Sequence, residues 1–364
     1  MKIQISEPMK KRLAPWACAI REVATSRFYA TYLALIFVFG GVVYGLAEKY
    51  DSGFTVSGVL YSKPLHGALL IFVSLFLSLR LLYITIVLHP PRPLTVFIVE
   101  MKMLWFTPRR IVLGMSLMIF VPIFFSFFTS AKNLIPFIQP FAWDPALSEW
   151  DRTLHFGRHP WEWLHPVLKA AFITSTISFF YKLWFFNKYV MVLWQAFSLK
   201  CLNLRARYFI TMILVWIVNG FVLALIFSSA GPCYFSYFYP DLPNPYEGMT
   251  AYLRQSHEKM EVMDLWAMDY LLNAYKTKTS NLFSGISAFP SMHVSVALLN
   301  ALAGWRIHRA LGVIFAVYLI FIMAGSVHIG WHYAVDGYMS LVTTTVIWLI
   351  VGRFFPRDEQ QDKK

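Results

Sequence analysis

The sequence has few cysteines and few charged residues. Its three cysteines, Cys18, Cys201 and Cys233, are scattered and odd in number, so they predict neither a disulfide framework nor a metal cluster. Only 14% of the 364 residues are charged and 58% are hydrophobic, whereas about a quarter of the residues in a soluble domain are charged. No low-complexity linker or internal repeat divides the chain. The composition therefore excludes an ordinary soluble domain and favours a single membrane domain.

Long apolar runs recur along the chain. About 20 apolar residues form a helix that crosses roughly 30 Å of hydrocarbon with its backbone polar groups bonded internally. The first run begins near residue 28 and is long enough to span, so we expect it to remain as an anchor. We predict an all-α polytopic membrane protein with about eight transmembrane helices, near residues 28–46, 66–89, 111–130, 172–197, 208–230, 291–306, 310–327 and 334–352.

Basic residues are distributed unevenly between the two sides of the predicted membrane domain. A formal charge of +13 also suits a nucleic-acid partner. However, nineteen Lys and Arg residues fall in one alternating set of hydrophilic segments and ten in the opposite, longer set. This asymmetry follows the positive-inside rule, so we expect a bilayer and no nucleic acid as partner. Both chain ends should be cytoplasmic, with residues 131–171 and 231–289 on the extracytoplasmic face.

These two long external segments are rich in aromatic residues, and we expect them to be ordered. Trp143 and Trp150 are typical of a membrane interface, where amphipathic rings set the depth of a protein in the bilayer. The alternative is a lid over a lipid site. Asp144 and Asp151 would share one helix face, but carboxylates at this spacing are common on solvated surfaces. We therefore expect no catalytic role for them.

The residues best suited to catalysis lie in two short segments at the ends of predicted helices, PSMH at 290–293 and HIGWHYAVD at 328–336. His332 and Asp336 are four apart, so on a helix the carboxylate would orient the imidazole and make it a better nucleophile. His293, in the first turn of the facing helix, is placed to protonate a departing oxygen. Ser291 and the free N–H groups after Pro290 would hold phosphate oxygens.

These two segments resemble the motifs of a known family. PSMH is similar to the Pro-Ser-x-His motif of the type-2 phosphatidic acid phosphatase superfamily, and HYAVD at 332–336 to its terminal His-x-x-x-Asp. The resemblance implies a six-helix core, a site without metal or cofactor, His332 as nucleophile, Asp336 as its orienting partner and His293 as general acid. AFPSMH at 288–293 with GWHY at 330–333 most resembles the inositol phosphorylceramide synthase branch and its bacterial relatives.

The resemblance suggests three parts of the chain. Residues 1–109 would be a cytoplasmic N-terminus with two accessory transmembrane helices. Residues 110–352 would form the six-helix catalytic core, and residues 353–364 a cytoplasmic tail.

The sequence departs from the family at its phosphate-binding cations. The family's first motif, a Lys followed six residues later by Arg-Pro, should fall in residues 229–243, which contain no Lys or Arg. The Arg usually found six residues before the nucleophile is Ser326. Phosphoryl transfer needs positive charge around the phosphate oxygens, so other residues must supply it. The candidates in the same external layer are Arg254, Lys259, Lys276 and Lys278, with His328 as a further donor. Charges within predicted helices are costly and are also functional candidates, namely Arg80, Lys182 and Lys188.

Three readings compete for the two histidine segments. His328, His332 and Asp336 are also spaced like helical metal ligands, although no further cluster completes such a site. A transporter or scaffold with a degenerate site would fit the missing cations. We favour a membrane lipid phosphatase or phosphotransferase that acts on a lipid phosphate ester or diphosphate, with an isoprenyl diphosphate phosphatase as the alternative. Its expected location is a bacterial inner membrane.

Overall fold

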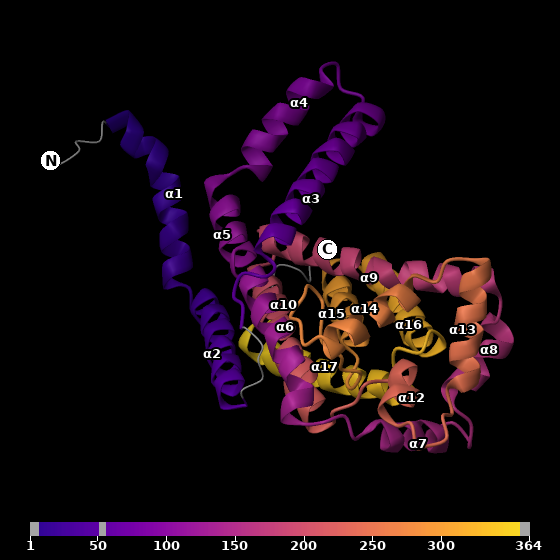
Figure 1. Ribbon diagram of the computed structural model, residues 1–364. Helices are drawn as coiled ribbons and strands as arrows, with labels where there is room; N and C mark the ends of the chain where they lie inside the picture. Colours follow the sequence, from indigo (N-terminus) through magenta and orange to yellow (C-terminus); the bar gives the residue numbers. More distant parts are fainter. Residues whose placement is uncertain (1–6, 51–55, 357–364) are drawn as a thin grey trace.

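The computed structural model describes residues 7–50 and 56–356, and no strand forms among them (Figure 1). Six of the described helices are long and apolar enough to cross a membrane. They cover Arg27–Lys49, Leu69–Leu88, Pro108–Ile138, Leu202–Ile226, Arg309–His328 and Ala334–Phe354. The prediction of an all-α polytopic membrane protein is therefore confirmed. The predicted cytoplasmic ends at 1–6 and 357–364 lie outside the described residues.

The other two predicted spans are helices that pack in the same bundle. Lys182 and Lys188 interrupt the apolar sequence of α9 (Ala171–Phe197), which is one continuous helix. α15 (Met292–Ile307) has 16 residues, which extend roughly 24 Å at 1.5 Å per residue. Neither is among the six helices that are long and apolar enough to cross a membrane, because α9 carries polar residues of the candidate site and α15 is short.

The N-terminal third forms an arm, which packs on the bundle through its first two helices, and a projecting hairpin. Its helices are α1 (Glu7–Thr25), α2 (Arg27–Lys49), α3 (Ser62–Tyr83) with a π turn at Ile84–Leu88, and α4 (Pro93–Glu100) with a π turn at Met101–Trp105. In Figure 1, α3 and α4 project together from the rest of the molecule. The Nε of Arg80 on α3 donates to Oε1 of Glu100 on α4 at 2.8 Å, and this ion pair ties the hairpin together.

The C-terminal part is a tightly packed helical bundle. It contains α5 (Pro108–Met118), α6 (Phe120–Ile138), α9, α10 (Leu202–Ile217), a π turn at Val218–Leu223, α11 (Ala224–Ile226), α15, α16 (Arg309–His328) and α17 (Ala334–Phe354). α15 forms a hairpin with α16 and also packs against α17, which in turn contacts α10. Val294, Val296 and Leu299 of α15 are fully buried, and each such side chain contributes about 1.5–3 kcal/mol through burial.

The two long external segments are ordered, as predicted. They contain α7 (Asp144–Leu154), α8 (Pro160–Leu168), a 3₁₀ turn at Pro232–Tyr234, α12 (Phe235–Phe238), α13 (Glu247–Lys259) and α14 (Met263–Lys276). Figure 1 shows α7, α8, α12 and α13 along one rim of the bundle. This rim adjoins the ends of the helices that carry the two histidine segments, because α7 contacts α17 and α8 contacts α16.

Candidate active site

The starts of α15 and α17 are joined through their backbones. The hydroxyl of Ser291 accepts the N–H of Val294 at 3.4 Å and so caps α15. The N–H of Ser291 donates to the carbonyl of Asp336 at 3.2 Å. The hydroxyl of Ser340 donates to the carbonyls of Ser291 and Asp336, at 2.8 and 2.7 Å. These bonds hold the two histidine segments in a fixed relation.

His332 and Asp336 are in contact, with 3.1 Å between Nδ1 and Oδ2. The predicted geometry was wrong in one respect, because α17 begins at Ala334 and His332 lies before the helix. Asp336 is the third helical residue, and its Oδ2 also accepts the N–H of Tyr333 at 3.1 Å. The carboxylate therefore reaches the imidazole by folding back over the helix start, as a capping side chain does. Its Oδ1 is buried without a hydrogen-bond partner.

The imidazole of His332 is almost completely enclosed, with 7% of the residue exposed. Burial, together with the charge of Lys132, lowers its pKa to about 3, although a hydrogen bond to the backbone of Ala288 acts in the opposite direction. Because the neutral ring is favoured at physiological pH, one ring nitrogen keeps a lone pair. With Nδ1 directed at Asp336, Nε2 is the nitrogen available as a nucleophile.

His293 faces His332 across the site. It is the second residue of α15, and its ring centroid lies 6.1 Å from that of His332, with the ring planes tilted by 60°. Tyr181 stacks on the His293 ring at 4.5 Å, and Trp184 lies at 4.3 Å. The indole Nε1–H of Trp184 also donates to the His293 carbonyl at 3.0 Å. One phosphoryl group can therefore contact both imidazoles, with His293 held by two rings from α9.

Two acidic residues of α7 brace this arrangement, and sequence reasoning missed their role. Asp144 and Asp151 were expected on a solvated surface, but both are buried. Asp151 accepts the N–H groups of Ala334 and Val335 at 2.8 and 2.9 Å, so it caps α17 beside the catalytic candidates. Burial raises its pKa to about 6. The correct interpretation is that Asp151 positions the start of α17.

Asp144 connects the site to the other external segment. Its carboxylate accepts the N–H groups of Ala230 and Gly231 at 2.9 and 2.7 Å. It also accepts the hydroxyls of Tyr239 and Tyr333, at 3.1 and 2.9 Å. Burial raises the pKa of Asp144, and these four donors counteract that rise. Tyr333 is the neighbour of His332, so Asp144 helps to fix the turn that carries the nucleophile candidate.

Asp264 on α14 holds the same turn from the opposite side. Its Oδ1 accepts the indole N–H of Trp331 at 2.7 Å and lies 2.6 Å from Nζ of Lys182. Its Oδ2 accepts the hydroxyl of Ser178 at 2.7 Å. The turn before α17 is thus tied to α9 and α14 through one buried carboxylate.

The proposed phosphate-binding residues are dispersed. Pro290 and Ser291 lie at the start of α15, next to the histidine pair. His328 ends α16, and its Nε2 pairs with the Thr174 hydroxyl at 3.0 Å while its ring packs against His165 at 4.9 Å. It is therefore engaged by α8 and α9 instead of adding a donor beside His332.

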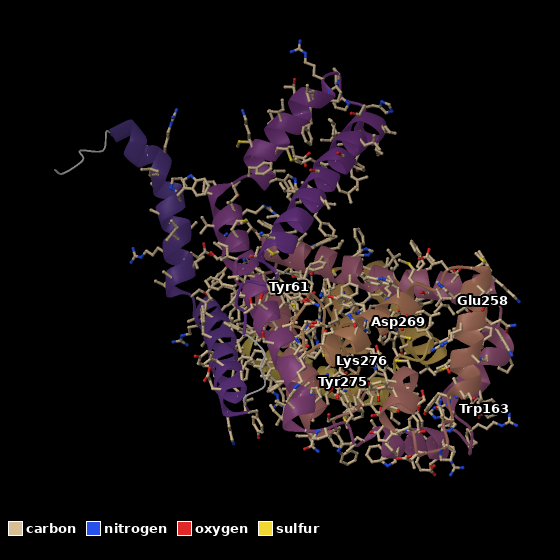
Figure 2. The ribbon with its side chains drawn as sticks, in the orientation of Figure 1. Tyr61, Trp163, Glu258, Asp269, Tyr275 and Lys276 are labelled. Carbon is tan, nitrogen blue, oxygen red and sulfur yellow. The ribbon has the colours of Figure 1, made fainter. Side chains whose placement is uncertain are left out.

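The four cations expected to clamp the phosphate are all exposed: Arg254 and Lys259 on α13, Lys276 at the end of α14 and Lys278 two residues after it. Figure 2 shows Lys276 at the end of α14, beside Tyr275. The Nζ of Lys276 lies 4.9 Å from the Tyr237 ring, and that of Lys278 lies 5.5 Å from the Phe137 ring. Arg254 is exposed on α13. Within the described part of the chain, no three metal-ligating side chains are grouped.

One of the three comparisons with known proteins found a match. The family model for the PAP2 superfamily matches residues 145–350, more than half of the chain. The match begins within α7 and ends within α17, so it includes both histidine segments and both external segments from Pro145 onward. The curated proteins gave no match, and the solved structures gave none either.

Proposed function

Since this chain belongs to the PAP2 superfamily, we propose that it cleaves or transfers the phosphoryl group of a membrane lipid through a phosphohistidine on His332. The observation that carries the proposal is the contact of His332 with Asp336 at 3.1 Å while His293 faces it with 6.1 Å between ring centroids. A nucleophile, its orienting carboxylate and a general acid are thereby assembled around one space.

The reaction would proceed in two steps. In the first, Nε2 of His332 forms a bond to phosphorus while the bond from phosphorus to the leaving oxygen breaks, and His293 gives a proton to that oxygen. In the second, water or a hydroxyl group attacks the phosphohistidine, the P–N bond breaks, and His293 takes up the proton of the attacking group. Asp336 stabilises the positive charge that develops on the His332 ring.

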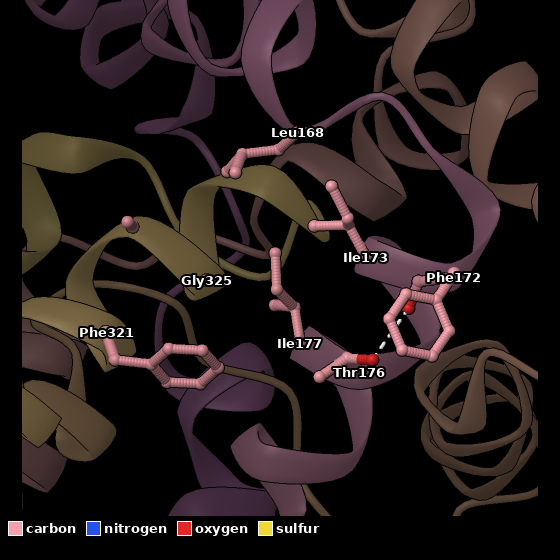
Figure 3. A pocket seen from close by; sticks show the side chains of 8 residues that line it. Leu168, Phe172, Ile173, Thr176, Ile177, Phe321 and Gly325 are labelled. Carbon is pink, nitrogen blue, oxygen red and sulfur yellow. Dashed lines mark hydrogen bonds between the residues drawn. The ribbon is translucent and has the colours of Figure 1, made fainter.

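A lipid substrate is supported by an apolar cavity close to the histidine pair. The cavity has a volume of about 300 Å³ and lies between α8, α9 and α16 (Figure 3). Its walls include Ile177 and Gly325, and a methyl group placed on Gly325 would lie 3.8 Å from Tyr181. Tyr181 in turn stacks on His293. An acyl or isoprenyl chain in this cavity would place its headgroup beside the imidazoles.

The sequence motifs and the distribution of basic residues support the acceptor and the orientation in this proposal. The resemblance of 288–293 and 330–333 to the inositol phosphorylceramide synthase branch favours a phosphotransferase, with a lipid or sugar hydroxyl resolving the phosphohistidine. The distribution of Lys and Arg supports a site on the extracytoplasmic face, and a bacterial inner membrane is the location that we propose.

The test is incubation of the purified full-length protein with radiolabelled phosphatidic acid or a phosphodiester phospholipid, with and without a hydroxyl acceptor. We expect acceptor-dependent label transfer and an acid-labile protein adduct, both lost in His332→Ala by roughly 10³-fold or more. His89→Asn, an exposed histidine of the α3–α4 hairpin, is the matched control and should leave turnover unchanged. Release of inorganic phosphate alone would exclude the transferase version, and turnover by His332→Ala would exclude the mechanism.

A further inference from the structure

Lys188 on α9 is a buried cation without an acidic partner. It is 3% exposed, and no described residue makes a hydrogen bond or ion pair with it. Its Nζ instead lies over five aromatic rings, those of Phe125, Tyr189, Trp184, Trp216 and Phe185, at 4.6, 4.8, 4.9, 5.2 and 5.4 Å from their centroids. Ring faces stabilise an ammonium group without cancelling its charge. A buried charge held in this way remains available to an anion.

This aromatic cage adjoins the histidine pair directly. Trp184, one wall of the cage, lies 4.3 Å from the His293 ring between centroids, and Phe185, another wall, lies 6.4 Å from it. Trp184 therefore contacts both the ammonium group and the general-acid candidate.

Lys132 on α6 lies beside the segment that leads into the site. Gly285 packs against it, because a methyl group placed on Gly285 would lie 2.9 Å from Cγ of Lys132. Gly285 belongs to the segment that leads into Pro290 and Ser291. Among the residues that the structure describes, none forms an ion pair with Lys132, and its charge adds to burial in lowering the pKa of His332.

Lys182 provides an internal contrast. It also lies on α9 near the site, with its Nζ 5.5 Å from the Trp331 ring. However, its Nζ is 2.6 Å from Oδ1 of Asp264, which neutralises it. Its position is explained by the bracing of the turn before His332, whereas no described carboxylate accounts for Lys132 or Lys188.

We propose that Lys132 and Lys188 supply the positive charge that holds the substrate phosphate against His293 and His332. They would replace the Lys and Arg that the sequence lacks in residues 229–243 and at Ser326. This inference rests on the proposed function and names the residues that bind its phosphate. Equatorial oxygens of a phosphoryl group in transfer carry most of the negative charge, and nearby cations stabilise it.

Binding of inorganic phosphate by the full-length protein in detergent tests the inference, read from tryptophan fluorescence, since Trp184 borders the cage. We expect Lys132→Met and Lys188→Met each to weaken phosphate affinity by roughly 10- to 100-fold, the loss of one charge-assisted contact. Lys188→Arg should recover part of that loss, because the guanidinium group keeps the charge. Lys102→Met, an exposed lysine outside the bundle, is the matched control.

Three outcomes separate the two proposals. If the parent protein neither binds phosphate nor turns over a lipid phosphate, the proposed function fails. If it does both and the Lys132 and Lys188 variants keep full affinity with unchanged thermal unfolding, only this inference fails. If Arg254→Met, Lys276→Met or Lys278→Met weakens binding instead, the exposed cations are the clamp and the inference is likewise overturned.

Discussion

The α3–α4 hairpin and the C-terminal bundle are equally apolar in sequence but differ in how they are packed. The span at Leu69–Leu88 has 6% of its residues buried within the protein, whereas the span at Leu202–Ile226 has 61%. Both are expected to contact lipid or other helices, because hydropathy does not distinguish the two environments. The side chains of the hairpin span are therefore mostly not covered by other parts of the protein, whereas the bundle span is mostly packed against other helices.

Charged side chains also differ in burial between the hairpin and the region around the histidine pair. In the hairpin, Arg80 and Glu100 form one partly exposed ion pair at 2.8 Å. On α7 and α14, which cover the end of the bundle that carries the histidine pair, Asp144, Asp151 and Asp264 are buried, and each accepts at least two hydrogen bonds. Substitutions of buried acids should therefore affect activity strongly and those in the hairpin weakly.

The largest effect is expected for Asp336→Asn. An amide oxygen in the position of Oδ2 can still accept the N–H of Tyr333 and the Nδ1–H of His332. It lacks, however, the negative charge that stabilises the cation formed on the ring when Nε2 attacks phosphorus. We expect turnover to fall by roughly 10³- to 10⁴-fold with little change in thermal unfolding. Steady-state kinetics beside a melting curve checks this, and a loss below tenfold would contradict the assigned role of Asp336.

A smaller, pH-dependent effect is expected at Asp151. Its pKa of about 6 in the folded protein exceeds the value of about 3.9 for a free side chain. Its stabilising contribution is therefore complete below pH of about 4 and is lost as pH rises through 6. Activity should show the opposite trend, because only the carboxylate accepts both N–H groups at the start of α17. We expect turnover to decline as the pH falls below about 6.

The Asp151→Asn variant isolates this residue. It should reduce turnover by roughly 10- to 100-fold, since one N–H group at the start of α17 loses its acceptor, and it should flatten the acid limb of the pH profile. Glu149→Gln, an exposed carboxylate on the same helix, is the control. An acid limb that persists unchanged in Asp151→Asn would assign the titration to another group.

The smallest effect is expected in the hairpin. Arg80→Met with Glu100→Gln removes both charges of its ion pair, whose side chains are 32% and 13% exposed. Partly exposed pairs contribute about 0–1 kcal/mol, so turnover should stay within about twofold of the parent. A tenfold loss in the same lipid assay would show that the hairpin contributes to the site, which would contradict the functional difference between the hairpin and the bundle.

The sequence predicts the helical fold and the histidine pair well, because both depend on local patterns. Apolar runs mark helices wherever they pack, and Ser291, His293, His332 and Asp336 lie in short motifs at helix ends. The role of Asp151 could not be predicted, since its partners Ala334 and Val335 are more than 180 residues away. The seven-residue spacing from Asp144 predicts that Asp151 shares a helix face with it, but spacing does not show what that face contacts.

Long-range packing also explains why the sequence could not place the basic residues around the site. His328 was expected beside His332 by helical spacing, but α16 ends at His328 and Gly330, at a φ of 78°, reverses the chain. Only glycine adopts that backbone conformation without strain. Lys132 approaches the site from α6, more than 150 residues before either histidine motif, and nothing in its local sequence distinguishes it from an interfacial lysine.

The cap that Asp151 places on α17 also limits where free phosphate can bind. A helix start carries unpaired N–H groups and a partial positive charge, which attract anions from solution. At Ala334 and Val335 the protein fills that position with the Asp151 carboxylate, so these two N–H groups are not open to an anion from solution.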